Sequence, residues 1–168
     1  MVNEKHMELA LQHAENALEN GEFPVGCVIA HRGRVVATGC RINSFGAVNE
    51  MDHAEMIALR AMLECGETIN AEEVTIYSTM EPCLMCFATL LVNGVRNFVY
   101  GYEDVMGGGT NLPIAQLSPL YSGLELSIIG AVLRKKSLAL FQRFFASSDN
   151  IYLQDSLLAH YTLQQTVS

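Results

Sequence analysis

The sequence predicts an α/β fold, in which helices and strands alternate along the chain. Residues 4–20 repeat apolar side chains at spacings of three and four, which is the pattern of an amphipathic helix. Residues 74–79 are rich in β-branched side chains, and a helical stretch separates them from another apolar run at 95–100. This order predicts a parallel pair of strands joined by a right-handed crossover. The 168 residues, 50% of them hydrophobic, suffice for one domain with a sizeable core.

The first helix is predicted to end at Gly21, because glycine readily takes the left-handed conformation that closes helices. Its two histidines, His6 and His13, are expected at the surface. The pattern assigns this helix to packing and gives it no part in chemistry.

A β-hairpin is expected next, with strands at 23–30 and 34–39 and a turn at Gly33. Pro24 and Gly26 allow the backbone to approach another group closely where the first strand begins. Two interpretations stay open here, namely a plain edge strand and a wall of a substrate site.

Asp52 is a suitable N-cap for a helix expected over residues 53–64. After this helix, residues 74–79 are expected to form a central strand of the sheet. Pro82 is expected to start the next helix, at a position where proline is tolerated, and that helix should end at Asn93 and Gly94.

The C-terminal part is predicted to contain a strand at 125–130 and a long helix at 131–146. The pattern breaks after that helix. We therefore expect one domain over residues 1–148 and a helical tail over residues 149–168, which packs on this domain or on a neighbouring subunit.

Ligand sites in sheets of this type collect at the carboxyl ends of the strands. Asp104 follows such an end, and it is either a substrate contact or part of a solvated loop. Tyr102 is a candidate for stacking on a substrate ring. The three glycines at 107–109 are expected to form a flexible loop able to move over a pocket.

A metal site is indicated by Cys83 and Cys86, which lie one helical turn apart where a helix is expected to begin. A helix N-terminus favours thiolate over thiol. His53 supplies a third ligand. Three protein ligands with an open fourth position are typical of a catalytic zinc, whereas a structural zinc has four. We therefore expect Zn²⁺ as the cofactor, held by His53, Cys83 and Cys86.

Glu55 lies two residues after His53 and is not needed to complete the metal shell, so it is a candidate catalytic acid–base. Ideal helical spacing would place the two side chains about 200° apart. Both can face one metal only where His53 lies at an irregular helix entry, and the sequence leaves that geometry open.

The charge and composition of the chain limit the kinds of partner and compartment that we expect. The net charge is −8, which disfavours tight polynucleotide binding, because phosphate contacts need a basic face. The single basic cluster, at 134–136, is expected to be a solvated helix face. We expect no membrane span and no secretory signal. Five cysteines without a disulfide pattern favour a reducing, cytoplasmic compartment.

His-x-Glu followed by Pro-Cys-x-x-Cys is the signature of zinc deaminases that act on nucleobases. On these residues the chain resembles the cytidine deaminase-like superfamily, and within it most of all the bacterial tRNA adenosine deaminases. The resemblance implies a three-layer α/β/α fold with a mixed five-stranded sheet over residues 1–148, and usually a homodimer. The matching stretches are residues 23–26, 53–55, 79–86 and 99–101, together with Asp104.

The same resemblance implies zinc binding by the three ligands named above, proton shuttling by Glu55, and substrate contact by Asp104 and Asn43. The backbone around Ala54 and at Pro82 is expected to hold the edge of the base. The reaction expected is hydrolytic replacement of an exocyclic amino group by oxygen, with release of ammonia.

Three alternatives for the function stay open, two of which differ in substrate and one of which is not catalytic. Motif likeness favours adenosine in tRNA. The acidic charge and Met106, which stands where tRNA deaminases commonly carry a lysine, favour a free base, a nucleoside or a related amino-heterocycle. The third is a non-catalytic zinc-binding subunit of a deaminase complex, against which the intact Glu55 argues.

Overall fold

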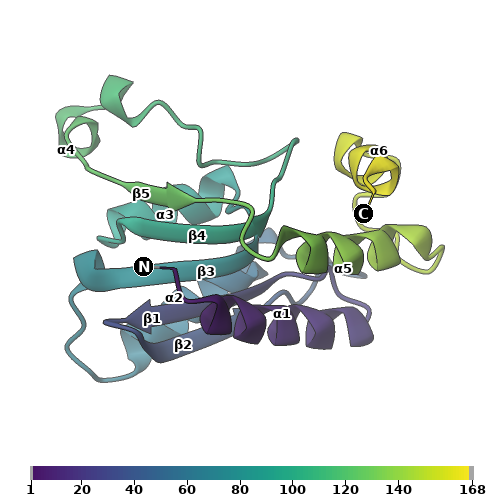
Figure 1. Cartoon of the computed structure of the whole chain (residues 1–168), viewed down its shortest axis with the longest axis horizontal. Coiled ribbons are helices and arrows are strands. Elements are labelled where there is room, and N and C mark those ends of the chain that lie inside the picture. Colours follow the sequence, from purple (N-terminus) through teal and green to yellow (C-terminus); the bar gives the residue numbers. More distant parts are fainter. Residues whose placement is uncertain (1, 167–168) are drawn as a thin grey trace.

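A computed structural model describes residues 2–166, and within that range five strands form one mixed sheet between two layers of helices (Figure 1). The strand order is β2-β1-β3-β4-β5. β1 runs antiparallel to both β2 and β3, whereas β3, β4 and β5 are parallel. This confirms the predicted three-layer α/β/α fold. The strands are β1 (Gly26–His31), β2 (Arg34–Cys40), β3 (Val74–Met80), β4 (Asn97–Tyr102) and β5 (Ser127–Ile129).

The helices cover both faces of the sheet (Figure 1). α1 packs on β1 and β3 while α5 packs on β4, and α2 with α3 lies on the opposite face. The C-terminal α6 packs on α5. The helices are α1 (Glu4–Glu19), α2 (Ala54–Glu64), α3 (Leu84–Val92), α4 (Pro119–Ser122), α5 (Arg134–Ala146) and α6 (Leu157–Gln164).

β1 is the buried strand of the hairpin. Cys27 and Ile29 belong to the core beneath α2 and α3, whereas Val28 packs with α1. The edge-strand interpretation is therefore wrong, because β1 lies between two neighbours and is covered on both faces. At Gly26 a Cβ would lie 2.0 Å from the carbonyl oxygen of Ala10, so the close approach expected there is made to α1.

Local signals place most element ends. Gly21 has φ +76° just after α1, and the hairpin turns at Arg32 and Gly33, both with positive φ. His6, however, is only 8% exposed and packs edge-on against the ring of Tyr77, with 5.0 Å between ring centroids. The prediction of a surface position for His6 is wrong, because α1 lies across β3 and its buried face reaches the first turn.

The segment after α5 is only partly the helical tail predicted over residues 149–168. The chain makes turns over residues 152–155, and α6 begins only at Leu157. Leu158 and Ala159 are buried against the domain. Residues 167 and 168 of the predicted tail lie outside the described residues. Among the helices of residues 2–166, none is long and apolar enough to cross a membrane.

Candidate active site

The entry to α2 gives His53 an irregular backbone. His53 is the N-cap of α2 with extended dihedrals of φ −64° and ψ 147°. Asp52 was expected at that position, but it ends a short 3₁₀ turn and accepts hydrogen bonds from Asn43 and Asn49. Because His53 lies outside the helical register, its ring and Glu55 can converge. This is the geometry that the sequence left open.

The entry to α3 brings in the two cysteines. Cys83 is the N-cap, with φ −65° and ψ 170°, and Cys86 lies in the first helical turn. Pro82 therefore precedes the N-cap and does not start the helix, contrary to the prediction. The segment follows the carboxyl end of β3, so both thiols lie where a parallel strand ends.

Three ligand atoms meet between these helix starts. His53 Nδ1 lies 3.5 Å from the Sγ of Cys83 and 3.5 Å from the Sγ of Cys86, and all three atoms lie within 4.8 Å of one another. Zinc bonds of about 2.3 Å to sulfur and 2.0–2.1 Å to nitrogen imply about 3.6 Å between such atoms in a tetrahedron. The donor set and its spacing therefore fit Zn²⁺.

Charge distribution suits a cation at this point. The hydrogen bond from Cys86 lowers the pKa of the Cys83 thiol to about 4, while that of Cys86 is raised. Burial of the His53 ring opposes its protonation, but contacts with Cys83, Glu55 and Glu50 raise its pKa to about 9. Negative charge thus surrounds the imidazole, and a metal ion can take the place of its proton.

Glu55 is buried beside the thiols, with 3% of its surface exposed. Its Oε1 accepts a hydrogen bond from Ser78 at 3.0 Å, and its Oε2 lies 3.6 Å from the Sγ of Cys86. Burial raises the pKa of this carboxyl above its ordinary value. A carboxyl with a raised pKa can both take up and release a proton near neutrality.

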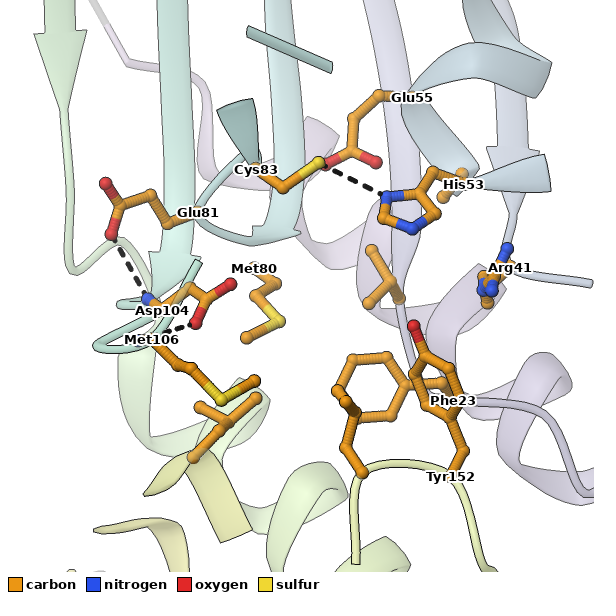
Figure 2. A pocket seen from close by; sticks show the side chains of 14 residues that line it. Phe23, Arg41, His53, Glu55, Met80, Glu81, Cys83, Asp104, Met106 and Tyr152 are labelled. Carbon is orange, nitrogen blue, oxygen red and sulfur yellow. Dashed lines mark hydrogen bonds between the residues drawn. The ribbon is translucent and has the colours of Figure 1, made fainter. Parts of the chain in front are cut away.

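A pocket of about 180 Å³ opens onto this group. In Figure 2, His53, Cys83 and Glu55 converge at one end of the pocket, while Phe23 and Tyr152 lie at the other. The lining residues are Phe23, Val25, Arg41, His53, Ala54, Glu55, Met80, Glu81, Cys83, Asp104, Met106, Tyr152, Leu153 and Leu158.

The four expected substrate contacts divide into two pairs. Ala54 and Asp104 line the pocket. Asn43 and Pro82 are not among the lining residues. The side-chain amide of Asn43 donates to Asp52 at 2.7 Å, and the carbonyl of Pro82 accepts from Gly109 at 2.9 Å.

The glycine loop is fixed to the start of α3. Glu81 accepts hydrogen bonds from the backbone of Asp104 and Thr110. A Cβ on Gly108 would lie 2.6 Å from the Glu81 carboxylate, and one on Gly109 would lie 2.8 Å from the backbone of Leu84. Gly108 and Gly109 therefore permit close approach to the start of α3, and movement of this loop over the pocket stays a prediction.

Tyr102 does not face the pocket. It is fully buried, its hydroxyl shares a 3.1 Å hydrogen bond with Thr162, and its ring stacks on Phe141. The proposed stacking of Tyr102 on a substrate ring is therefore wrong. Tyr102 is still part of β4, and its side chain belongs to the same core cluster as those of Phe98 and Phe141.

Sequence reasoning missed part of the lining. Arg41 and Tyr152 belong to an irregular loop and to the predicted tail, and no local pattern marked them. The wall interpretation of the hairpin did anticipate Phe23 and Val25, which line the pocket. Only packing between distant segments brings Arg41, Tyr152 and Leu158 to it.

These features define a class of protein, an α/β protein in which a His/Cys/Cys group that could hold a metal lies at two helix N-termini. Residues 1–102 match the family model for the cytidine and deoxycytidylate deaminase zinc-binding region. The chain belongs to this family. It is accordingly a zinc-dependent hydrolytic deaminase that acts on the exocyclic amino group of a nucleobase.

Two curated relatives and one solved structure are similar over most of the chain. A tRNA-specific adenosine deaminase 2 from Xenopus tropicalis is 33% identical over 147 residues, covering 83% of this chain and 86% of the relative. A tRNA-specific adenosine deaminase from Agrobacterium fabrum is 34% identical over 138 residues, covering 77% and 90%. A structure from a study of A-to-I editing by tRNA:A34 deaminases has a TM-score of 0.68 at 26% identity, covering 82% and 99%.

Proposed function

We propose that this enzyme deaminates adenosine in transfer RNA to inosine. The observation that carries the chemistry is a buried Glu55 beside the His53, Cys83 and Cys86 group at the closed end of a pocket. The proposed substrate is supported by the similarity to tRNA-specific adenosine deaminases.

Nδ1 of His53 and the thiols of Cys83 and Cys86 are the groups that would hold one Zn²⁺. When bound there, Zn²⁺ would supply a nucleophile at neutral pH, because it lowers the pKa of a bound water to about 7. The protein fixes the positions of the three donor atoms. Two helix N-termini fix the three donor atoms, which leaves Glu55 outside the shell.

Glu55 is proposed to move the protons. Its Oε2 takes a proton from the attacking water and delivers it to the ring nitrogen next to the amino-bearing carbon. The oxygen forms its bond to that carbon, and the bond to the amino group then breaks. Glu55 takes the second proton from the added oxygen and delivers it to the departing amino group, which leaves as ammonia while the carbon keeps the oxygen as a carbonyl. The hydrogen bond from Ser78 to Oε1 keeps Oε2 directed at the reacting atoms.

Substrate contacts are proposed for the pocket residues Ala54 and Asp104. The backbone of Ala54 lies at the start of α2, next to Glu55. Asp104 is partly buried, and its Oδ1 accepts from the backbone N–H groups of Met106 and Gly107. The contacts expected of Asn43 and Pro82 stay predictions, since both groups bond elsewhere in the chain.

A homodimer in a reducing, cytoplasmic compartment completes the proposal. Large apolar side chains are exposed around the entries to α2 and α3, including Phe45 at 54%, Met51 at 55% and Leu84 at 56%. Such a group of side chains is typical of an interaction surface. Each of the five cysteines, all within the described residues, is free of disulfides. Light scattering on purified protein tests the dimer.

A second candidate is a free base or nucleoside as substrate. Besides the charge of −8, the basic cluster is engaged within the chain, since Arg134 pairs with Glu103 and Lys136 with Glu8. Met106 lines the pocket. These observations favour a small neutral ligand over a phosphate backbone.

The deciding experiment measures ammonia release and base conversion on a panel of tRNA, nucleosides and free bases. The proposal expects inosine in tRNA, with an affinity that falls as salt rises. Turnover of a free base or nucleoside together with inert tRNA would favour the second candidate. The absence of ammonia from every substrate with zinc-loaded protein would contradict both.

A further inference from the structure

The second ring nitrogen of His53 faces a carboxylate. Nδ1 points at the two thiols, while Nε2 lies 3.0 Å from Oε2 of Glu50 (Figure 2 shows the ring beside the thiol of Cys83). A ring nitrogen that ligates a metal carries no proton, so the proton of the neutral ring lies on Nε2 and is donated to Glu50. A carboxylate in that place fixes the tautomer and the orientation of the ring.

Glu50 is held in place by two side chains from distant parts of the chain, Arg41 and Tyr152. Its side chain is 57% exposed and would be mobile without partners. Arg41 donates to its Oε2 at 3.2 Å and to the carbonyl of Asn49 at 2.7 Å. Arg41 is itself 2% exposed. A buried cation therefore fixes an exposed carboxylate against the histidine ring.

The third group comes from the C-terminal segment. The hydroxyl of Tyr152 donates to Glu50 at 3.0 Å and 3.2 Å, to the two carboxylate oxygens. The ring of Tyr152 packs on Phe23, at 5.3 Å between centroids, and lies 5.5 Å from the guanidinium of Arg41. The ring thus anchors the segment after α5 on the pocket wall while the hydroxyl reaches the carboxylate.

We propose that Glu50, held by Arg41 and Tyr152, is a positioning residue for the metal ligand His53, so that the segment after α5 forms part of the catalytic apparatus. This inference rests on the proposed function of His53 as a zinc ligand.

A matched control exists within the chain. Glu73 also accepts from a histidine and an arginine, His31 and Arg32, but it lies outside the group that could hold a metal. Zinc affinity is measured by competition with a chromophoric chelator. Glu50→Ala is expected to weaken zinc binding about 10-fold to 100-fold, whereas Glu73→Ala leaves it unchanged. Glu50→Gln, whose amide oxygen still accepts from Nε2, should recover part of the loss.

Removal of the Tyr152 hydroxyl tests the role of the C-terminal segment, while the ring that packs on Phe23 stays in place. Tyr152→Phe should weaken zinc binding by roughly threefold to tenfold, because Arg41 still holds the carboxylate. The control is Tyr161→Phe. Tyr161 donates to Glu103, which pairs with an arginine but with no histidine. Tyr161→Phe should bind zinc like the wild type.

A spectroscopic readout separates positioning from general stability. With Co²⁺ in place of zinc, the visible bands should shift in Glu50→Ala and in Tyr152→Phe but in neither control. Wild-type affinity and spectra in both of these variants would overturn the inference while leaving the proposed function intact. A wild-type protein that binds no zinc would overturn the proposed function itself. Should Glu50→Ala fail to fold, Tyr152→Phe decides.

Discussion

The metal-binding end of the pocket and its far wall are built in different ways. The metal-binding end comes from two helix entries, where His53 and Cys83 are N-caps with extended dihedrals. The wall combines Phe23 and Tyr152, which come from segments far apart in the sequence. The first depends on local backbone geometry and the second on packing across the domain. The metal ligands are thus presented by local backbone geometry, whereas the shape of the pocket, and the support that Tyr152 gives to His53 through Glu50, depend on distant contacts.

The two regions also differ in what holds them. Glu55 and the thiols are polar groups whose partners lie within the site. Phe23 is instead the centre of an aromatic cluster, with ring centroids 5.2–5.9 Å from those of Phe141, Phe144, Phe145 and Tyr152. A change at the metal-binding end should therefore affect chemistry first, and a change in the wall should affect stability and substrate affinity first.

The largest effect is expected from Cys86→Ser. Metal binding and folding are coupled in such sites, with apparent zinc binding energies of about 10–16 kcal/mol. Loss of one of three ligands should weaken zinc binding by roughly a thousandfold, abolish turnover and lower the melting temperature. Metal analysis and thermal denaturation check this. Cys65→Ser, at an exposed position, is the control. Full zinc content in Cys86→Ser would mean that the ligand set is wrong.

Chelation should reproduce that result without a substitution. Removal of the metal from the wild-type protein should abolish turnover, and added Zn²⁺ should restore it. Turnover that persists in metal-free protein would show that the reaction does not depend on a metal at the metal-binding end of the pocket.

Glu55→Gln should separate catalysis from metal binding. Loss of the proton carrier is expected to lower kcat by about 10²-fold to 10⁴-fold, while zinc content stays at the wild-type level. Stability should hold or rise, because burial already disfavours the charged form of Glu55. Glu73→Gln, at a remote ion pair, serves as the control. Retained turnover in Glu55→Gln would assign proton transfer to another group.

Phe23→Ala tests the wall. Truncation of a buried phenylalanine typically costs about 3–5 kcal/mol, and here it removes the centre of the aromatic cluster. Chemical denaturation measures the loss. In the protein that stays folded, KM should rise more than kcat falls, and zinc content should be normal. If Phe23→Ala lost zinc as readily as Cys86→Ser, the division between the two regions would be refuted.

This division also explains what the sequence could predict. The metal group and the parallel strands around it follow from local patterns, since Pro-Cys-x-x-Cys and His-x-Glu each lie at a helix entry. Arg41 and Tyr152 escaped prediction because their positions depend on how the segment after α5 folds back on the hairpin. His6 was misplaced for a related reason, because helical periodicity does not reveal where the sheet beneath a helix ends.

Asp104 stands between the two regions and should give the smallest effect. Burial is the main cause that raises the pKa of this carboxyl in the folded protein. A raised pKa means that the folded state holds its proton more tightly than the unfolded chain, so stability from this group is complete below about pH 3.9 and is lost as the pH rises through the folded value. Asp104→Asn removes this loss and keeps an oxygen for the backbone N–H groups of Met106 and Gly107.

The substrate-free Asp104→Asn protein should therefore match the wild type in stability at acidic pH and exceed it slightly at neutral pH. Denaturation across a pH series measures this difference. Because Asp104 is also a proposed substrate contact, KM should rise in the same variant, with zinc content unchanged. A variant that is less stable than the wild type at neutral pH would show that the Asp104 charge stabilises the loop, and a normal KM would remove Asp104 from the substrate site.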